Sequence, residues 1–344
     1  MSGAPPPTAR RRGILAAGNF IIDQVKFLDA YPEEETCVTI RSLSRSNGGA
    51  PYNVLVDLAR MRVDYPLEAL GLLGDDSEGL EIRNHCESLG IDTRKLASAR
   101  GARTSFSDIV TITGTGKRTI LQFPGASALL RKEHFDFGDT SAKILHLAFL
   151  ALLEGLDQPS ATHGTVAAEV LAEAQRIGLI TSSDVVTDQS GRLPGLVTAA
   201  LPHLDYFFAN EIEMELLTGL SVRSQSGSLD FERMEAACRR LVERGLNRWL
   251  VVHTAEMAVA FRPGEPVRLQ GSVRIPAVSI RGTNGAGDAF AAGFLHGVHQ
   301  EEPISECLRL GVCVAAASLS DGTPSAGVTP VEQCLSLGER YGFR

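Results

Sequence analysis

The chain has 344 residues, of which 44% are hydrophobic and 22% charged, and these ordinary proportions exclude a fibrous repeat and wholesale disorder. Its net charge of −8 argues against a nonspecific nucleic-acid surface and against binding to an anionic membrane. The six cysteines are scattered without C-x-x-C spacing, which is typical of reduced cytoplasmic thiols and not of a disulfide framework or a zinc site.

The beginning of the chain predicts a tail followed by a folded domain. Residues 1–12 are rich in proline and arginine, and we expect them to be a disordered tail. The apolar run that follows, Ile14–Ala17, is too short for a signal peptide, and no segment approaches the length of a transmembrane helix. We assign the rest, 13–344, to one domain.

Strand-like segments alternate with helical patterns along that domain. The strand-like segments are 14–22, 67–74, 143–151, 179–187, 204–210 and 248–254. The helical patterns include 53–61, 166–178, 212–219 and 231–245. Repeated βα units of this kind predict an α/β fold with a mainly parallel sheet covered by helices.

Two stretches interrupt this alternation. Residues 37–46, CVTIRSLSRS, and 104–123, which contain a G-T-G turn, alternate apolar with polar side chains. Such alternation indicates half-exposed antiparallel strands and a hairpin. A small sheet that projects from the core would suit a lid over a binding site.

Two early segments are candidates for ligand binding. Gly48 and Gly49 precede Asn53 at the start of an apolar helix, where exposed backbone and a side-chain amide could bind a polyol or could simply cap the helix. Asp23 is placed at the end of the first strand, followed by a loop at 24–34. Ligands collect beyond the carboxyl ends of strands in open α/β sheets, although an aspartate there is also a common turn former.

A third candidate is the glycine-rich segment GTNGAGDAF at 282–290. We expect it to join a strand at 273–280 to an apolar helix at 288–300. The unpaired N–H groups and positive potential of a helix start favour a phosphate or another anion. The alternative is a tight turn in which Asp288 only complements the helix dipole.

Five segments together resemble the ribokinase/PfkB family of carbohydrate kinases over nearly the whole chain. They are GNFIID, NGGAPYNVLVDLARM, GLLGDDSEGLEIRNHCESLGID, ANEIEMELLTG and GTNGAGDAFAAGF, in the family's order. The resemblance implies a ribokinase-like three-layer α/β/α core with a mainly parallel sheet, plus a small β-sheet lid. It also implies transfer of a phosphoryl group from ATP to a hydroxyl of a small sugar.

The family's chemical roles fall on matching residues of this sequence. Asp288 corresponds to the base, and the backbone N–H groups of Gly285, Ala286 and Gly287 correspond to an anion hole for the moving phosphoryl group. The resemblance places Asp23, Gly49 and Asn53 at the sugar hydroxyls. These side chains offer the hydrogen-bond donors and acceptors that a sugar requires.

The nucleotide side follows from the N-x-x-E motif and its neighbours. Asn210, Thr254 and Thr283 would contact ATP, and Glu213 would hold Mg²⁺ through a water molecule; a plain helix start is the alternative for the Asn210–Glu213 pair. The chain lacks the usual T-L-G-x-x-G after 248–254. Gly282 stands where the family usually has an aspartate beside a K⁺ site, so K⁺ is a doubtful cofactor.

The sequence leaves several functional alternatives open. A Rossmann dehydrogenase and a Walker-type NTPase are excluded because their glycine motifs are absent. A nucleoside substrate stays open beside a small sugar, as does a catalytically silent relative that only binds sugar or nucleotide. A homodimer through the edge of the lid is also expected from the resemblance.

Overall fold

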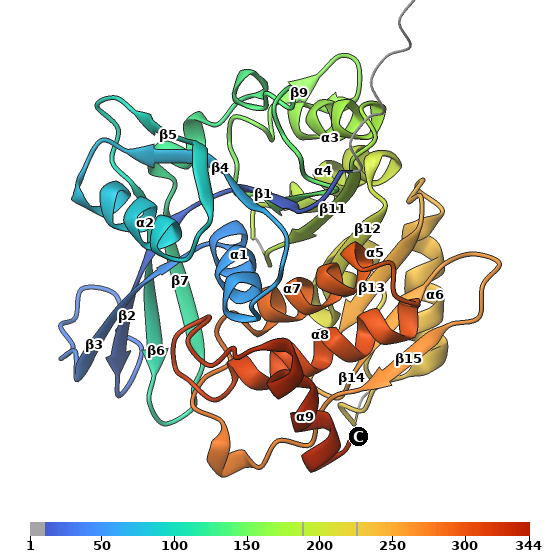
Figure 1. The fold of residues 1–344 in the computed structure, drawn as a ribbon. Helices are drawn as coiled ribbons and strands as arrows, with labels where there is room; N and C mark the ends of the chain where they lie inside the picture. Colours follow the sequence, from blue (N-terminus) through green and yellow to red (C-terminus); the bar gives the residue numbers. More distant parts are fainter. Residues whose placement is uncertain (1–10, 188, 225) are drawn as a thin grey trace, which may run out of the picture.

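The computed structural model describes residues 11–187, 189–224 and 226–344, and Figure 1 shows their arrangement. The first ten residues of the predicted tail lie outside this part. Arg12, the last residue of that prediction, belongs to the fold, because its N–H donates to the carbonyl of Ser141 at 2.7 Å.

A nine-stranded sheet forms the middle of the molecule, in the order β15-β14-β13-β12-β11-β8-β1-β4-β5. Neighbouring strands from β5 to β13 pair in parallel, and β14 and β15 continue the sheet antiparallel at one edge. The strands are β1 (Ile14–Gly18), β4 (Leu67–Gly74), β5 (Asp92–Ala99), β8 (Ile144–Leu150), β11 (Ile180–Val185), β12 (Tyr206–Asn210), β13 (Trp249–His253), β14 (Met257–Phe261) and β15 (Arg268–Gly271). The predicted mainly parallel sheet is confirmed.

Helices cover both faces of this sheet, which gives three layers. The helices are α1 (Ala50–Arg60), α2 (Ser77–Ser88), α3 (Val166–Arg176), α4 (Leu193–Ala200), α5 (Glu211–Thr218), α6 (Phe231–Val242), α7 (Ala286–His299), α8 (Ile304–Ser318) and α9 (Val331–Tyr341). Apolar residues of α1, α2, α7, α8 and α9 share one core cluster, and those of α3, α4, α5 and α6 share the other.

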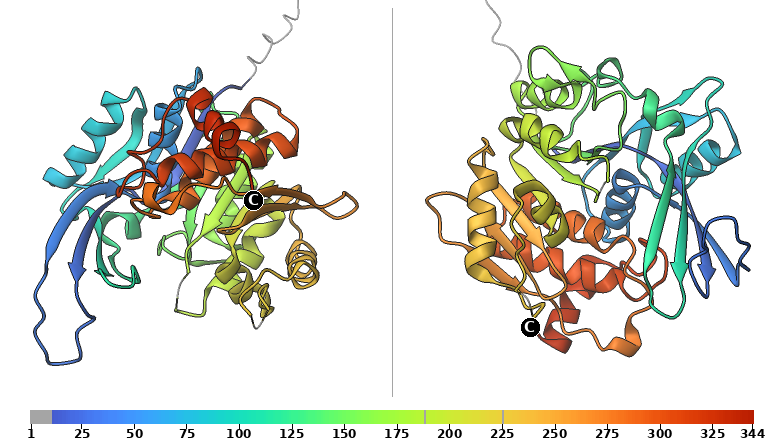
Figure 2. Two further views of the ribbon diagram at one scale, coloured as in Figure 1. Left: turned by 90° about the horizontal axis from the view of Figure 1, so that it is seen from below. Right: turned by 180° about the vertical axis from the view of Figure 1, so that it is seen from behind.

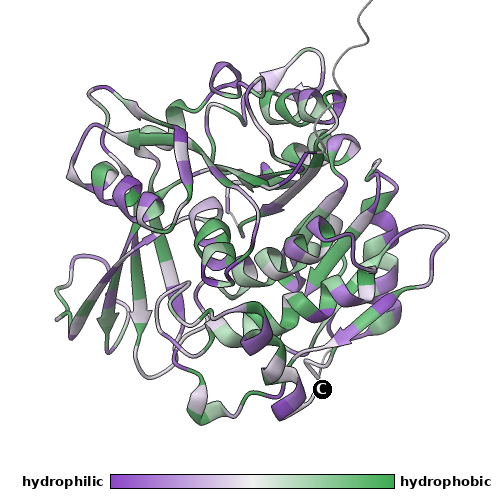
Figure 3. Ribbon diagram, viewed as in Figure 1, coloured by the Kyte–Doolittle hydropathy of each residue, from purple (hydrophilic) through white to green (hydrophobic). Residues whose placement is uncertain are grey.

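The central strand β1 shows why the sequence builds two cores. Ile14 and Ala16 belong to one cluster, whereas Leu15 and Ala17 belong to the other. Successive side chains of a strand point to opposite faces, so a strand that is buried on both faces must be apolar throughout. Figure 3 shows this apolar colour along the middle of the sheet. Within the described residues, no helix combines the length and the apolar character needed to cross a membrane.

A second, four-stranded sheet projects from one side of the core (Figure 2, left). It contains β2 (Ile21–Leu28), β3 (Ser42–Gly48), β6 (Ser105–Ile112) and β7 (Arg118–Phe123), in the order β3-β2-β6-β7. We call this sheet the lid. A two-stranded ladder of β9 (Pro159–Ser160) and β10 (Gly164–Thr165) lies before α3.

The lid differs from the expectation at two places. The segment predicted as a loop at 24–34 begins with most of β2, in which Val25 and Phe27 alternate with polar residues. Only the second half of 37–46 forms a strand. Because β2 ends at Leu28 and Phe27 pairs with Ser42, residues 37–41 have no strand beside them to continue the ladder.

The strand expected at 273–280 is also absent from the structure. Val273 makes an isolated bridge to Phe343, and Ala277–Ser279 form a short 3₁₀ helix. Pro276 lies in the middle of this segment and has no N–H to donate to a ladder. The glycine-rich segment that precedes α7 is therefore reached from an irregular loop.

Candidate active site

The candidate site lies at the carboxyl edge of the parallel sheet. Asn210 and His253 are the last residues of β12 and β13 and are paired in register. The start of α7 lies against this edge, because a Cβ atom at Gly287 would be 3.4 Å from Cε1 of His253. An open α/β sheet binds its ligands at this edge.

Helix α7 begins without a side-chain cap. Its N-cap is Gly285, with φ 74°, and within the described residues no side chain accepts a hydrogen bond from the first turn. A side chain at Gly285 would press on Pro324, since a Cβ atom there would lie 2.6 Å from the proline Cβ. The N–H of Ala286 makes a long hydrogen bond to the carbonyl of Thr283 at 3.4 Å, and no side chain of the described residues takes up the other N–H groups of this turn, which could therefore bind an anion.

Asp288 and Asn53 meet across two helices. The Asn53 side-chain amide donates from Nδ2 to Oδ2 of Asp288 at 2.6 Å, although 235 positions separate the two residues. Both side chains are buried, and burial raises the pKa of Asp288 to about 6 while the Asn53 hydrogen bond lowers it. Oδ1 of Asn53 has no partner among the described residues.

Asn53 is held there by the glycine turn that starts α1. Gly49 is the N-cap of α1 with φ 95°, a conformation that disfavours any other residue. A Cβ atom at Gly49 would overlap the carbonyl of Asn19, and one at Gly48 would overlap the Asp23 carboxylate. The two glycines thus let the lid, α1 and β1 approach closely.

Asp23 lies on the lid strand β2, not at the end of the first sheet strand as predicted. β1 ends at Gly18, and the chain crosses directly into β2, which carries Asp23 against Ser46 of β3. Burial and the negative charge of Asp288 raise the pKa of Asp23 to about 7, while Arg118 and a hydrogen bond with Asn284 lower it. The lid therefore brings Asp23 next to Asp288.

Arg118 and Asn284 are site residues that the sequence analysis missed. Nη1 of Arg118, at the start of β7, donates to Oδ1 of Asn284 in the loop before α7 at 3.2 Å. Asn284 occupies the variable position of the T-x-G-A-G-D pattern, and Arg118 lies in a hairpin that was noted only for its alternation. The hydrogen bond joins the lid to the loop that starts α7.

The N-x-x-E pair forms a reciprocal cap at the start of α5. Oδ1 of Asn210 accepts from the N–H groups of Ile212 and Glu213, each at 2.9 Å, and Oε2 of Glu213 accepts from the N–H of Asn210 at 2.8 Å. Burial raises the pKa of Glu213 to about 8, and its hydrogen bonds with Asn210 lower it. The first turn of α5 is thus satisfied by its own side chains.

Asp184 is a second buried acid that the sequence analysis did not select. It is the penultimate residue of β11, and burial, followed by the charges of Asp288 and Glu213, raises its pKa well above the ordinary value. Its Oδ1 has no partner among the described residues, and its Oδ2 lies 3.9 Å from Nε2 of the buried His146. Asp184 therefore lies near enough to Glu213 of α5 and Asp288 of α7 for their charges to interact.

Thr254 and Thr283 are placed in turns. The hydroxyl of Thr254 accepts from the N–H of Glu256 at 3.2 Å and from that of Met257 at 3.1 Å, which closes the β13–β14 turn. The carbonyl of Thr283 accepts from the N–H of Ala286 at 3.4 Å. Each threonine therefore borders the edge of the sheet where the candidate residues gather.

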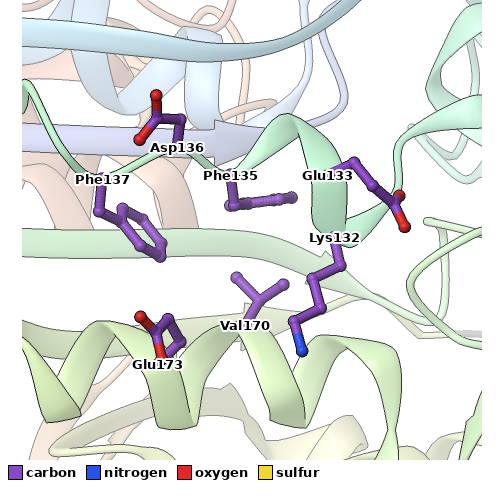
Figure 4. A pocket seen from close by; sticks show the side chains of 7 residues that line it. All are labelled: Lys132, Glu133, Phe135, Asp136, Phe137, Val170 and Glu173. Carbon is purple, nitrogen blue, oxygen red and sulfur yellow. The ribbon is translucent and has the colours of Figure 1, made fainter.

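One surface pocket lies away from the candidate residues. Its volume is about 460 Å³, and Figure 4 shows the side chains that line it: Lys132, Glu133, Phe135, Asp136, Phe137, Val170 and Glu173. It contains none of the candidate residues. The candidate site is defined instead by convergent polar groups at the sheet edge.

Known proteins resemble this chain along nearly its whole length. The sequence pattern of the pfkB family of carbohydrate kinases matches residues 12–330. The deoxyribokinase of Salmonella typhi is 25% identical over 329 residues, which cover 95% of this chain and 99% of that protein.

Two solved structures show the same fold. The ribokinase of Giardia lamblia has a TM-score of 0.81 with 18% identity, covering 97% of this chain and 100% of that one. The Arabidopsis thaliana ribokinase complexed with ribose and ATP has a TM-score of 0.77 with 20% identity, covering 95% of this chain and 98% of that one. The fold is therefore ribokinase-like, and the chain belongs to the pfkB family of carbohydrate kinases, as a sugar kinase that phosphorylates an alcohol group.

Proposed function

We propose that this kinase transfers the γ-phosphoryl group of ATP to a hydroxyl of a small sugar, with Asp288 as the base. The observation that carries the proposal is the 2.6 Å hydrogen bond from Asn53 to Asp288 at the first turn of the uncapped helix α7. It puts a side-chain amide and a carboxylate next to the backbone N–H groups of that turn.

Asp288 has the properties of a base for a hydroxyl proton. With a pKa of about 6, the carboxylate is mostly ionised at neutral pH and remains a better proton acceptor than an exposed aspartate. Asn53 donates to Oδ2 of Asp288, so Oδ1 of Asp288 is available to orient the sugar hydroxyl. Asp288 then takes the hydroxyl proton as the oxygen bonds to phosphorus.

The start of α7 would stabilise the charge on the moving phosphoryl group. The N–H groups of Gly285, Ala286 and Gly287 lie at the positive end of the helix dipole, where donors to an anion cost no reorganisation. Asn284 and Arg118 would tie the lid to this loop and help to exclude water from the reacting groups.

Asp23, Gly49 and Asn53 would hold the remaining sugar hydroxyls. The free Oδ1 of Asn53 is a buried acceptor, and Asp23 brings a second acceptor from the lid. Because Asp23 lies on the lid, sugar binding and lid position would be coupled.

Asn210, Thr254 and Thr283 would contact the nucleotide, and Glu213 would serve Mg²⁺. Glu213 and Asp184 are neighbouring carboxylates, and Asp184 has an unpartnered oxygen, which suits a hard cation that prefers oxygen ligands and water. Bound Mg²⁺ would neutralise charge on the phosphates. Without a bound cation, burial lets these two acids keep their protons to a higher pH than exposed acids do.

The test is an ADP-release screen of the purified enzyme. Pentoses, hexoses, 2-keto-3-deoxygluconate and nucleosides are supplied with ATP and Mg²⁺, and we expect turnover with a small sugar. Turnover with nucleosides alone would favour the nucleoside alternative. Binding of sugar or nucleotide without turnover across the panel would instead identify a silent relative and reject the proposal.

We also propose that the lid pairs with a second copy of the chain in the cytoplasm. β3 and β7 are its edge strands, and their exposed apolar residues include Leu43, Ile120 and Leu121. Exposed edges and apolar faces favour association. All six cysteines are free, which suits a reducing compartment. Light scattering that gives a monomer mass at micromolar concentration would reject the dimer.

A further inference from the structure

A small polar pocket lies between α1 and α2. Its volume is about 200 Å³, which is room for roughly six water molecules or for one ligand of that size. Among the described residues that line it, none belongs to the sugar or nucleotide sites proposed above. The lining residues include Asn47 on lid strand β3, Tyr52 and Arg60 on α1, Glu81 and His85 on α2, and Ser325 in the loop 323–326.

Three buried polar atoms of the residues that line this pocket have no hydrogen-bond partner within the described residues. They are Oδ1 of Asn47, Nε of Arg60 and Oγ of Ser325, and Ser325 as a whole is only 7% exposed. Buried polar groups are nearly always paired with protein, water or a ligand. Donors and an acceptor left unpaired around one pocket therefore indicate a polar guest.

The neighbouring polar side chains are already paired with one another. The Tyr52 hydroxyl lies 2.6 Å from Nδ1 of His85, and both carboxylate oxygens of Glu81 accept from Nη1 of Arg45 at 2.8 Å. In contrast, Nη1 of Arg60 makes only a long hydrogen bond of 3.4 Å, to a carbonyl of the loop. The Arg60 guanidinium therefore keeps hydrogen-bond donors for a ligand.

The charges around the pocket match a ligand with one negative charge. Glu81 and Arg45 form a neutral pair, and burial lowers the pKa of His85, so this ring is neutral at pH 7. Arg60 then supplies a single net positive charge, in a planar fork that fits the two oxygens of a carboxylate. Oδ1 of Asn47 needs a donor, which a hydroxyl group offers and a carboxylate does not.

We propose that this pocket binds a small hydroxycarboxylate, with its carboxylate on the guanidinium of Arg60 and its hydroxyl donating to Oδ1 of Asn47. The inference goes beyond the proposed function and does not require phosphoryl transfer. Pro324 lines the pocket and also lies against the start of α7, where a Cβ atom at Gly285 would be 2.6 Å from its Cβ. A ligand in the pocket would therefore contact the loop that supports the start of α7.

Ligand-observed NMR titrations of the full chain with lactate, propionate and glycerol test the inference without sugar or nucleotide. Lactate should bind about 3- to 10-fold more tightly than propionate, which lacks only the hydroxyl, and glycerol should not displace lactate. Arg60→Gln should weaken lactate binding about 10- to 100-fold, the range for a hydrogen bond to a charged group. Asn47→Ala should abolish the preference for lactate over propionate.

Arg176→Gln is the matched control, because Arg176 lies in the last turn of α3 as Arg60 lies in the last turn of α1. Asp288→Asn separates this pocket from the sugar site, and its lactate affinity should stay within about twofold of the wild type. If Arg60→Gln does not fold, the lactate-to-propionate ratio of Asn47→Ala decides the question.

Three results would overturn the inference. The first is lactate binding in folded Arg60→Gln that equals the wild type, and the second is tighter binding of inorganic phosphate than of lactate. The third is equal weakening of lactate in Arg60→Gln and Asp288→Asn, which would place lactate in the sugar site. The ADP-release screen is independent of these titrations, so the proposed function and this inference can fail separately.

Discussion

Helices α5 and α7 both start at the carboxyl edge of the sheet, yet their first turns are satisfied in different ways. At α5, Asn210 and Glu213 cap each other's backbone groups. At α7, Gly285 replaces a capping side chain, and within the described residues no side chain takes its place. The closed start holds its own polar groups, whereas the open start leaves N–H groups for a ligand.

The comparison gives different functions to two helix starts that the family motifs select equally. A capping serine does not fit at Gly285, because a Cβ atom there would lie 2.6 Å from Cβ of Pro324, so the start of α7 has no side-chain cap from its own N-cap residue. The N-x-x-E pair has a structural duty, and a role at the metal must come in addition to it. Experiments on the two helix starts should therefore give different kinds of defect.

The largest effect on kcat should come from a substitution at the start of α7. Asp288→Asn removes the base but keeps a side chain of the same size, so kcat should fall about 10²- to 10⁴-fold while the fold and nucleotide affinity persist. Steady-state kinetics and calorimetry measure the two quantities. Asp139→Asn, on an exposed loop, is the control. A kcat near that of the wild type would remove Asp288 from the chemistry.

Gly285→Ala should distort the backbone at the start of α7. The residue has φ 74°, and a Cβ atom would lie 2.6 Å from Cβ of Pro324, so the loop must shift. We expect kcat to fall about 10-fold or more and stability to fall by about 1–2 kcal/mol. Gly219→Ala at the end of α5 is the matched control, with φ 71° and open space around it. Equal kcat values in the two variants would contradict the role of the loop.

Glu213→Gln tests whether the closed start does more than cap a helix. Glutamine still accepts from the N–H of Asn210, so the cap survives while the charge is lost. The Mg²⁺ concentration for half-maximal rate should rise about 10-fold, the lower range for a group that acts through water. If the variant loses thermal stability but keeps its Mg²⁺ requirement, Glu213 only caps the helix.

The buried acids predict a pH dependence of stability. The folded pKa values of Asp23, Asp288 and Glu213 are about 7, 6 and 8, above the ordinary values of 3.8, 3.8 and 4.5. The native state therefore binds more protons than the unfolded state between about pH 4 and 8, and the free energy of unfolding must fall as pH rises through this window.

Denaturant unfolding at pH 5.5 and pH 8 measures this slope. We expect a contribution on the order of 1 kcal/mol from each acid, and Glu213→Gln should flatten the slope between pH 7 and 8. Stability that rises with pH in the ligand-free wild type would contradict the assignment of raised pKa values to these acids.

The smallest effect concerns K⁺ at the loop before α7. Gly282 brings no carboxylate there, so we expect the rate to change less than about threefold when K⁺ replaces a bulky organic cation at constant ionic strength. A Cβ atom at Gly282 would lie 3.1 Å from Cα of Gly322, so Gly282→Asp crowds the loop, and Gly282→Asn controls for that crowding. Activation by K⁺ in Gly282→Asp should exceed that in Gly282→Asn. A strong K⁺ requirement in the wild type would show that backbone carbonyls suffice.

The sequence predicted the buried strands well and the irregular connections poorly. β4 coincides with the predicted segment 67–74, because a strand covered on both faces is apolar at nearly every position, with Glu68 as the one charged residue here. The segment 273–280 has apolar residues too, but Pro276 cannot donate to a ladder and precedes a short 3₁₀ helix. β2 was missed because the interpretation of Asp23 as a strand end hid the alternation that follows it.

Within the site, the sequence analysis selected residues that lie in a recognisable motif. Asp288 and Asn53 each belong to such a motif, but the hydrogen bond that joins them depends on the packing of α1 against α7. Asp184, Asn284, Arg118 and His253 lie at positions that no pattern selects. Their place at the site follows from the topology, which brings distant strand ends and the lid to one edge.

The most direct test of the account uses ATP labelled in its γ-phosphate, with the preferred sugar from the screen. We expect the wild type to place the label on the sugar, with little released as inorganic phosphate, and Asp288→Asn to bind the same nucleotide while transferring the label at least 100-fold more slowly. Equal transfer by wild type and Asp288→Asn, or label released only as inorganic phosphate, would contradict the claim that the open start of α7 is where the sugar hydroxyl is phosphorylated.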